Sequence, residues 1–384
     1  MPGLLSVTTV PQTHSGFLLP YAHHFRALGW RVDGLAAGLS ACEPCIEAYD
    51  HVYDIEWSRN PFDPRNLTRA AARVRQIVQE GGYDIVHVHT PVASFVSRYA
   101  LRPMHKKGQL QVIYTAHGFH FHRDGHPLKN LAFLGLEKLA GGWTDYLVVI
   151  NREDEEDARK HKIVDPERIR YMPGIGIDLS QYNPERILPT TIQQLRQALE
   201  VDTDQVLFSM IAAFEPRKRH CDALDALAAL HDPGVVLAFA GVGPLQAAMV
   251  AKAEDLGVAH QVRFLGFRED IPTIIAASRA TLLPSEREGL PRSVMESMAL
   301  GTPVIATDAK GNRDLLEEDV GILVPIGDHQ AMARAMRYLL EHPNEARAMG
   351  ERARQHIRAF DLQRIIEMHE ALYEEALHHQ TKIL

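Results

Sequence analysis

Along this chain, short runs of β-branched and aromatic residues alternate with amphipathic helical patterns, and the alternation occurs twice. Such alternation is typical of parallel sheets whose strands are joined by crossover helices, so the expected fold class is α/β. An irregular stretch from about 173 to 204, rich in Gly, Pro, Asp and Thr, separates the two series. The expected strands are 4–8, 31–35, 85–89, 111–115, 146–150 and 170–172 in the first series, and 206–212, 235–240, 262–266, 280–284, 304–307 and 321–324 in the second.

The chain is long enough for two domains. Its 384 residues are about twice the usual domain length, and an apolar content of 46% can fill two cores. We expect a first domain over 1–180, a linker over 181–204, a second domain over 205–358 and a terminal helix over 359–384. The charged tail has a helical pattern and no strand, so we expect it to cross back onto the first domain.

The sequence argues against nucleic-acid binding and against a membrane-spanning segment. Lys and Arg total 41 against 49 Asp and Glu, a net charge of −8, which gives no global electrostatic reason to bind nucleic acid. No apolar stretch reaches the roughly 20 residues of a membrane-spanning helix. The first residues also lack the basic start and apolar core of a signal peptide. We therefore expect a cytoplasmic protein.

The three cysteines are too few for a disulfide framework and agree with a reducing compartment. Cys42 and Cys45 have the C-x-x-C spacing of zinc or redox sites, but no second cysteine pair could complete a zinc site. We interpret them as two small side chains in a turn that contains Pro44.

The most informative segment is 284–306, PSEREGLPRSVMESMALGTPVIA. It predicts a strand end, a loop with Glu286 and Glu288, a helix that starts near Pro291, a Gly-Thr-Pro turn and another strand. The positive end of the helix dipole then faces the carboxyl edge of the sheet, which predicts a diphosphate site. The backbone N–H groups expected to point at this site are those of Gly289, Leu290, Arg292 and the turn that leads to Ser293.

Two glutamates of this segment, Glu288 and Glu296, stand eight positions apart, so one precedes the helix and the other lies about two turns inside it. They can therefore hold opposite ends of one ligand. The segment resembles the E-x7-E signature of the family 4 retaining glycosyltransferases. This resemblance implies a GT-B fold, in which two Rossmann-like domains face each other across a cleft. It also implies that Glu288 contacts the donor sugar and Glu296 the ribose hydroxyls.

The resemblance extends to a histidine segment of the first domain. In TAHGFHFH, which follows an expected strand, His117 matches the family histidine that lies beside the reacting sugar. His120 and His122 follow in the same segment, and for them packed or solvated side chains are an open alternative.

Several donor contacts are implied by loops that resemble those of the family. Gly241 and Gly243 match the loop after the second strand of the donor domain, and Phe267 and Arg268 belong to the segment whose backbone meets the nucleobase. Gly16 lies in the first βα loop, where family glycines let the backbone approach the donor phosphate.

The family also carries an arginine and a lysine after the first strand of the second domain, and both neutralise the donor diphosphate. Lys218 stands at the lysine position, whereas Ala213 or Phe214 occupies the arginine position. Either Arg217 or Arg219 could substitute for the missing arginine.

The expected reaction needs no metal and no cofactor besides the nucleotide-sugar substrate. The resemblance implies a front-face mechanism, in which the departing phosphate oxygen takes the acceptor proton and Lys218 neutralises the diphosphate. The chain has one D-x-D, Asp202 to Asp204, and we interpret it as a turn because it precedes a strand far from the other loops of the site.

The histidine segment is similar to that of enzymes that build bacterial capsular polysaccharide and exopolysaccharide. This similarity implies transfer of an N-acetylhexosamine or hexose from a UDP-sugar to a polyprenyl diphosphate-linked sugar at the inner face of the cytoplasmic membrane. The candidate membrane contacts are the apolar run 17–21 and the basic run 98–107, for which a solvated helix end is the alternative. A non-hydrolysing sugar-nucleotide epimerase and a GT-B binding or regulatory protein without catalysis remain open.

Overall fold

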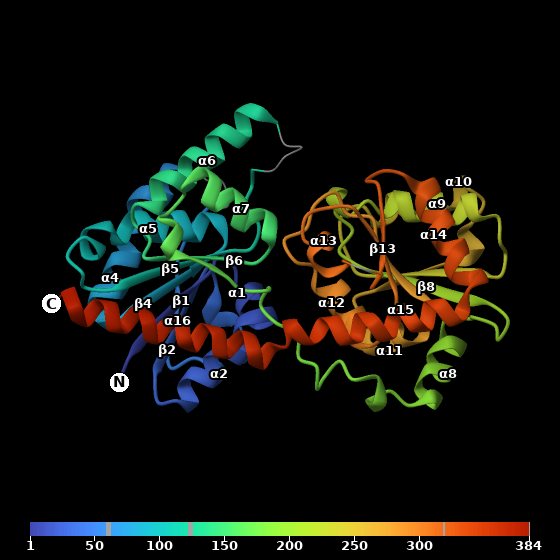
Figure 1. Cartoon of the computed structure of the whole chain (residues 1–384), viewed down its shortest axis with the longest axis horizontal. Coiled ribbons are helices and arrows are strands. Elements are labelled where there is room, and N and C mark those ends of the chain that lie inside the picture. The colour runs from blue at the N-terminus through green and yellow to red at the C-terminus, as the bar shows by residue number, and fades with distance from the viewer. Residues whose placement is uncertain (59–62, 122–125, 318, 384) are drawn as a thin grey trace. The chain divides into compact units, whose positions relative to one another are not determined.

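The computed structural model describes residues 1–58, 63–121, 126–317 and 319–383 (Figure 1). The chain forms two compact units. The first unit comprises Met1–Ile175 and Gln363–Leu384, and the second comprises Gly176–Leu362. The terminal helix α16 (Leu362–Ile383) therefore returns to the first unit, where Tyr373 packs near Phe25 and Trp30.

The expected linker over 181–204 is wrong, because this stretch belongs to the second unit. It contains helix α8 (Pro189–Ala198), and Leu195 and Leu199 are buried in one cluster with Leu207 of the second sheet. Its prolines misled the sequence prediction, since Pro184 and Pro189 open short helices instead of interrupting structure.

The first unit is built on a parallel sheet of seven strands in the order β3-β2-β1-β4-β5-β6-β7. Six of them lie within one residue of the expected bounds. The unpredicted strand β3 has three residues and lies at the sheet edge, so it carries too little periodicity to be recognised. The strands are β1 (Gly3–Val7), β2 (Arg31–Ala36), β3 (Val52–Asp54), β4 (Ile85–His89), β5 (Gln111–Ala116), β6 (Tyr146–Val149) and β7 (Ile169–Tyr171).

Helices cover both faces of this sheet (Figure 1). Successive strand residues enter opposite cores: Leu5 packs with the cluster of α4 and α5, and Leu4 with the cluster of α2 and α16. The other helical elements are α1 (Pro11–Thr13), η1 (His14–Leu18), α2 (Leu19–Ala27), η2 (Leu39–Ala41), α3 (Glu43–Ala48), η3 (Asn66–Ala70), α4 (Ala71–Gly81), α5 (Pro91–His105), α6 (Pro127–Gly141), α7 (Arg152–His161) and η4 (Pro166–Arg168).

The second unit repeats this architecture with six parallel strands in the order β10-β9-β8-β11-β12-β13. The strands are β8 (Val206–Ile211), β9 (Val235–Ala240), β10 (Val262–Gly266), β11 (Ala280–Leu283), β12 (Val304–Thr307) and β13 (Ile322–Val324). Its remaining helical elements are η5 (Pro184–Arg186), η6 (Pro216–Lys218), α9 (His220–Leu230), α10 (Gln246–Asp255), η7 (Ala259–Gln261), α11 (Ile271–Ala277), α12 (Arg292–Ala299), α13 (Asn312–Leu315), α14 (His329–Glu341), α15 (Pro343–His356) and η8 (Ile357–Phe360).

Both sheets have the strand order of doubly wound Rossmann-like folds, so the α/β prediction is confirmed. The order reverses between β1 and β4 in the first unit and between β8 and β11 in the second. Ligands of open α/β sheets bind outside the carboxyl ends of the strands at this reversal. We therefore expect a ligand of the second unit to bind at the loops after β8 and β11.

The turn at Cys42 and Cys45 differs from the prediction, because the two residues form a disulfide. Cys42 is the N-cap of α3, and Pro44 lies in the first turn of that helix. This turn brings the two Cα atoms to 5.2 Å, within the usual range for bonded cysteines.

Candidate active site

A lysine and a glutamate meet where the strand order of the second sheet reverses. Lys218 ends η6 in the loop after β8, and Glu288 lies in the loop after β11. The Lys218 Nζ atom lies 2.5 Å from Oε1 of Glu288, and only 13% and 8% of the two side chains are exposed. Nη1 of Arg217 lies 3.6 Å from Oε2 of the same carboxylate. One carboxylate thus lies beside two cations at the predicted diphosphate site.

Arg217 is held in this cluster from its other side. Its Nε donates a hydrogen bond of 3.0 Å to Glu215, and its carbonyl oxygen accepts one of 2.9 Å from the N–H of Glu286. The second bond ties the loop after β8 to the loop after β11. Glu215, a residue that sequence reasoning left out of the site, therefore orients Arg217.

Arg219 points to different partners. It donates two hydrogen bonds to Asp222, of 2.6 and 2.8 Å, and one of 3.1 Å to Glu286. These contacts hold its guanidinium at the start of α9. Of the two candidates for the missing arginine, Arg217 is the one that the structure brings to Lys218 and Glu288.

Neither residue at the position of the family arginine, Ala213 or Phe214, carries a charge. Phe214 is fully buried, with its ring stacked on His220 at a centroid distance of 4.1 Å, whereas Ala213 is exposed. Burial lowers the pKa of His220 to about 4, so the ring stays neutral in this apolar contact.

Glu296 lies on α12, almost fully buried, and its contacts were not predicted. Its Oε1 accepts hydrogen bonds from the Tyr182 hydroxyl at 2.7 Å and from Arg292 Nε at 2.9 Å. Burial raises the pKa of this carboxyl, and the two donors act in the opposite direction. Tyr182 escaped prediction because it is 114 residues away in sequence, inside the supposed linker.

The helix start differs slightly from the prediction. Pro291 occupies the N-cap of α12, and the helix itself begins at Arg292, so Ser293 lies in its first turn. Gly289 and Leu290 precede it and are half-buried. The loop after β12 packs against them, since a Cβ at Gly311 would lie 2.2 Å from the Gly289 carbonyl oxygen.

The loop glycines of the second unit have a packing role. A Cβ at Gly243 would lie 2.7 Å from the Phe214 backbone nitrogen, and one at Gly241 would lie 2.0 Å from the Ala212 carbonyl oxygen. These glycines therefore let the loop after β9 contact the loop after β8. After β10, Phe267 is 75% exposed and Arg268 pairs with Asp270 at 2.6 Å.

Gly16 of the first unit lies in a helical segment of the first βα connection. It belongs to η1, a π-helical turn that continues into α2. An added Cβ would meet nothing within 4 Å, so packing does not demand a glycine at this position.

His117 follows β5 and begins a ladder of stacked histidines. Its Nε2 lies 3.1 Å from Nδ1 of His89, His89 stacks on His87 at 4.2 Å, and His87 stacks on His369 of α16 at 5.8 Å. Burial lowers the pKa of His117 and of His369 to about 4, and those of His87 and His89 well below their ordinary value. The alternating His-x-His of β4 is the sequence signal that could have revealed this ladder.

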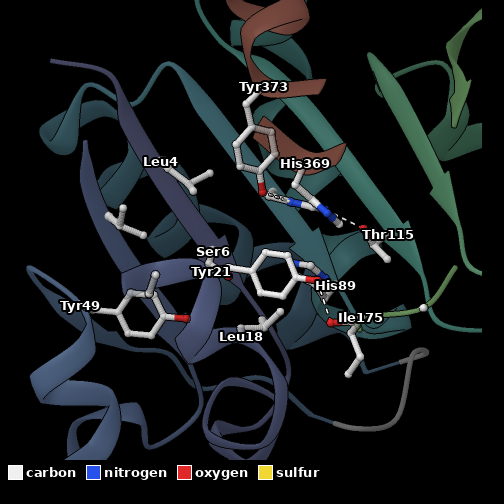
Figure 2. A pocket seen from close by; sticks show the side chains of 14 residues that line it. Leu4, Ser6, Leu18, Tyr21, Tyr49, His89, Thr115, Ile175, His369 and Tyr373 are labelled. Atoms are coloured by element: carbon white, nitrogen blue, oxygen red, sulfur yellow. Dashed lines mark hydrogen bonds between the residues drawn. The ribbon is translucent and has the colours of Figure 1, made fainter. Parts of the chain in front are cut away.

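Two hydrogen bonds hold His87, in the middle of the ladder. His87 contacts the Tyr373 hydroxyl at 2.5 Å and the Thr115 hydroxyl at 2.7 Å. Figure 2 shows His89, His369 and Tyr373 around a cavity of about 20 Å³. This volume holds about one water molecule, so the cavity is too small for a sugar.

Two further predicted features are the last histidines of the His117 segment and the D-x-D of the second unit. His120 is exposed, with its ring 5.4 Å from that of Phe133, and His122 lies outside the described residues. The Asp202 carbonyl accepts a hydrogen bond of 3.2 Å from the N–H of Gln205, so the D-x-D is a turn as predicted.

The two runs predicted to contact the membrane are only partly exposed. In the apolar run 17–21, Leu18 and Tyr21 are buried, and the Tyr21 hydroxyl donates to the Ile175 carbonyl at 2.8 Å. In the basic run 98–107, the Arg98 side chain is 1% exposed and pairs with Glu137 at 3.0 Å. Helix periodicity turns Leu18, Tyr21 and Arg98 inward, whereas Lys106 and Lys107 at the end of the basic run are exposed. Membrane contact therefore stays a prediction. No described helix is long and apolar enough to cross a membrane.

Comparisons with known proteins find family models that match both halves of the chain. The family model described as Glycosyltransferase Family 4 matches residues 18–181, and the model described as Glycosyl transferases group 1 matches residues 191–356. EpsD of Bacillus subtilis (strain 168), a protein named as a glycosyltransferase, is 33% identical over 383 residues, which cover 99% of this chain and 98% of EpsD. An Escherichia coli enzyme named UDP-Gal:alpha-D-GlcNAc-diphosphoundecaprenol alpha-1,3-galactosyltransferase is 28% identical over 68% of this chain and 67% of its own length.

Solved structures share the fold. Anabaena HepE in complex with UDP has a TM-score of 0.80 at 22% identity, covering 98% of this chain and all of HepE, 100%. WaaG, a glycosyltransferase involved in lipopolysaccharide biosynthesis, has a TM-score of 0.74 at 19% identity, covering 96% of this chain and 98% of WaaG. The GT-B fold of two Rossmann-like domains is thereby confirmed.

Proposed function

Because this chain belongs to the family 4, or group 1, glycosyltransferases, we propose that it moves a sugar from a nucleotide diphosphate donor to a lipid-linked glycan. The observation that carries this proposal is the cluster of Arg217, Lys218 and Glu288 where the second sheet reverses its strand order. Two cations beside one carboxylate suit a ligand that joins an anionic diphosphate to a hydroxyl-bearing sugar.

The donor in this proposal is a UDP-hexose or a UDP-N-acetylhexosamine. HepE has been solved with UDP and with UDP-glucose, and the Escherichia coli relative is named for UDP-Gal. Glu288 would accept hydrogen bonds from the sugar hydroxyls, and Glu296 would hold the ribose. The N–H groups of Gly289 and Leu290, and the helix start before Ser293, would face the diphosphate.

Transfer would proceed with retention on the front face of the sugar. The bond from the anomeric carbon to the phosphate oxygen breaks, and the acceptor oxygen forms the new bond on the same face. The acceptor proton passes to the departing phosphate oxygen. Lys218 and Arg217 would stabilise the negative charge of the leaving diphosphate, each contact contributing roughly 1.5 to 3 kcal/mol, without a metal ion.

The first unit would bind the acceptor at the carboxyl edge of its sheet. His117, neutral at pH 7, can offer one hydrogen bond to the acceptor or to the primary hydroxyl of the sugar. Gly16 would allow close approach of the η1 backbone. The name of the Escherichia coli relative includes a GlcNAc-diphosphoundecaprenol acceptor, which supports a polyprenyl diphosphate-linked sugar here. The enzyme would then act peripherally at the inner face of the cytoplasmic membrane in bacterial surface polysaccharide synthesis.

A transfer assay with radiolabelled UDP-sugars and a detergent-solubilised polyprenyl diphosphate sugar tests this function. We expect labelled lipid to form, and to form equally well in EDTA. An epimerase would convert the donor without an acceptor, and a binding protein would leave the donor intact. Either outcome would contradict the proposed transfer reaction. Loss of transfer in EDTA with recovery in Mg²⁺ or Mn²⁺ would contradict its metal independence.

A further inference from the structure

Helix α6 exposes an unusual number of leucines. Leu128, Leu131 and Leu139 are 72%, 68% and 55% exposed. At 3.6 residues per turn they fall on one side of the helix, with the exposed Ala132 and Gly135 between them. Figure 1 shows α6 at the periphery of the first unit. A soluble helix normally turns such a stripe toward a core.

The opposite side of α6 already contacts the core. Phe133 and Leu134 pack against the buried cluster of the first unit. Glu137 points the same way, because its carboxylate accepts hydrogen bonds from Arg98 at 3.0 Å and from the Tyr114 hydroxyl at 3.1 Å. The inner face therefore anchors the helix, and the leucine stripe has no role in holding the unit together.

The exposed charges of α6 itself are all positive. Glu137 is the one acidic residue of α6, and it is paired inward with the buried Arg98. Lys129 and Lys138 are exposed and stand about a quarter of a turn to either side of the stripe. Within the described residues, neither lysine forms an ion pair. Lys106 and Lys107 are also exposed, at the end of the neighbouring helix α5.

We propose that α6 is a membrane-docking helix that lies in the interface of an anionic bilayer. The leucines would enter the acyl boundary while the lysines stay among the lipid phosphates. A helix of 15 residues is about 22 Å long, too short to span a bilayer and suited to lying in its surface. This inference rests on the proposed function, in which the acceptor is embedded in a membrane.

Charge favours a lipid surface over a second copy of the chain. A pair of α6 helices packed through their leucines would surround one apolar contact with four lysines, Lys129 and Lys138 of each copy. The one acidic residue of α6, Glu137, is paired inward and cannot neutralise them, whereas anionic lipid phosphates would.

The test is cosedimentation of the full-length chain with vesicles of phosphatidylcholine alone or with a quarter of phosphatidylglycerol. We expect the wild type to bind the anionic vesicles, and less so in high salt. The double variant Leu131→Ser/Leu139→Ser should lower the partition coefficient by at least about tenfold. The charge variant Lys129→Glu/Lys138→Glu should lower it for anionic vesicles only. The matched control Leu28→Ser, at a 49% exposed leucine that ends α2, should stay within about twofold of wild type.

Thermal unfolding would verify that each variant folds. Wild-type binding that the α6 variants do not weaken would overturn the proposal, because another surface would then carry the contact. Sedimentation velocity adds a second check: a wild-type dimer that the leucine variant dissociates would assign the stripe to a second copy. The wild-type protein could also fail to bind vesicles and still glycosylate the solubilised lipid. That result would contradict the membrane-docking role of α6 but not the proposed function.

Discussion

At the scale of single residues, Lys218 and Arg217 are expected to stabilise the same leaving group. Lys218→Ala should lower kcat by roughly 10²-fold, because it deletes one preorganised donor worth roughly 2 to 4 kcal/mol in the transition state. Arg217→Ala should approach this loss, since its guanidinium lies 3.6 Å from the same Glu288 carboxylate. Steady-state kinetics with saturating donor would measure both.

Arg219→Ala is the control for this prediction. Its guanidinium is held by Asp222 and Glu286, so kcat should change by less than about threefold even if the protein loses some stability. If Arg217→Ala left kcat unchanged and Arg219→Ala lowered it strongly, the assignment of the two arginines would be reversed.

The sequence predicted residues of the candidate donor site but not their partners. Lys218, Glu288 and Glu296 are recognisable because each has a fixed position relative to a strand or helix end. Tyr182 and Glu215 are not, because their roles depend on which loops the fold brings together. Tyr182 reaches Glu296 across 114 residues of sequence, and no local pattern encodes that contact.

At the scale of elements, the alternating hydrophobic pattern predicted twelve of the thirteen strands. It failed where tertiary contacts outweigh local signals. The edge strand β3 has only three residues. Helix α8 begins with Pro189, and this proline favoured a linker in the sequence prediction. The first βα loop, which contains Gly16, forms the π-helical η1, and no local pattern predicted this turn.

Two glycines with contrasting surroundings test how loops position the site. Gly243→Ala would place a Cβ 2.7 Å from the Phe214 backbone, in the loop that leads to Lys218. The backbone must shift, so we expect unfolding to become easier by about 1 to 3 kcal/mol. Gly16→Ala should change stability by less than about 1 kcal/mol, because its Cβ meets open space. Urea unfolding of both variants measures the difference, and equal losses would contradict the loop-packing role of Gly243.

At the scale of the whole molecule, the two units repeat one topology but differ in their buried histidines. Burial lowers the pKa of His14, His117 and His369 in the first unit to about 4, and of His220 in the second unit to about 4. Because these values lie below the ordinary 6.5, the unfolded chain binds protons first as the pH falls. Each histidine therefore adds stability above about pH 6.5 that is lost progressively down to about pH 4, roughly 3 kcal/mol per group.

The first unit should accordingly unfold at a higher pH than the second. Its three tryptophans, Trp30, Trp57 and Trp143, are the only ones in the chain, so tryptophan fluorescence reports on this unit alone. In an acid titration from pH 7.5 to 4, we expect the fluorescence change to precede part of the loss of helical circular dichroism. His369→Gln should move the fluorescence midpoint to lower pH, since one proton-binding group is removed from the unfolded state, whereas His126→Gln at an exposed position should leave it in place. Coincident transitions that neither variant shifts would show that the histidine ladder does not set the acid stability of the first unit.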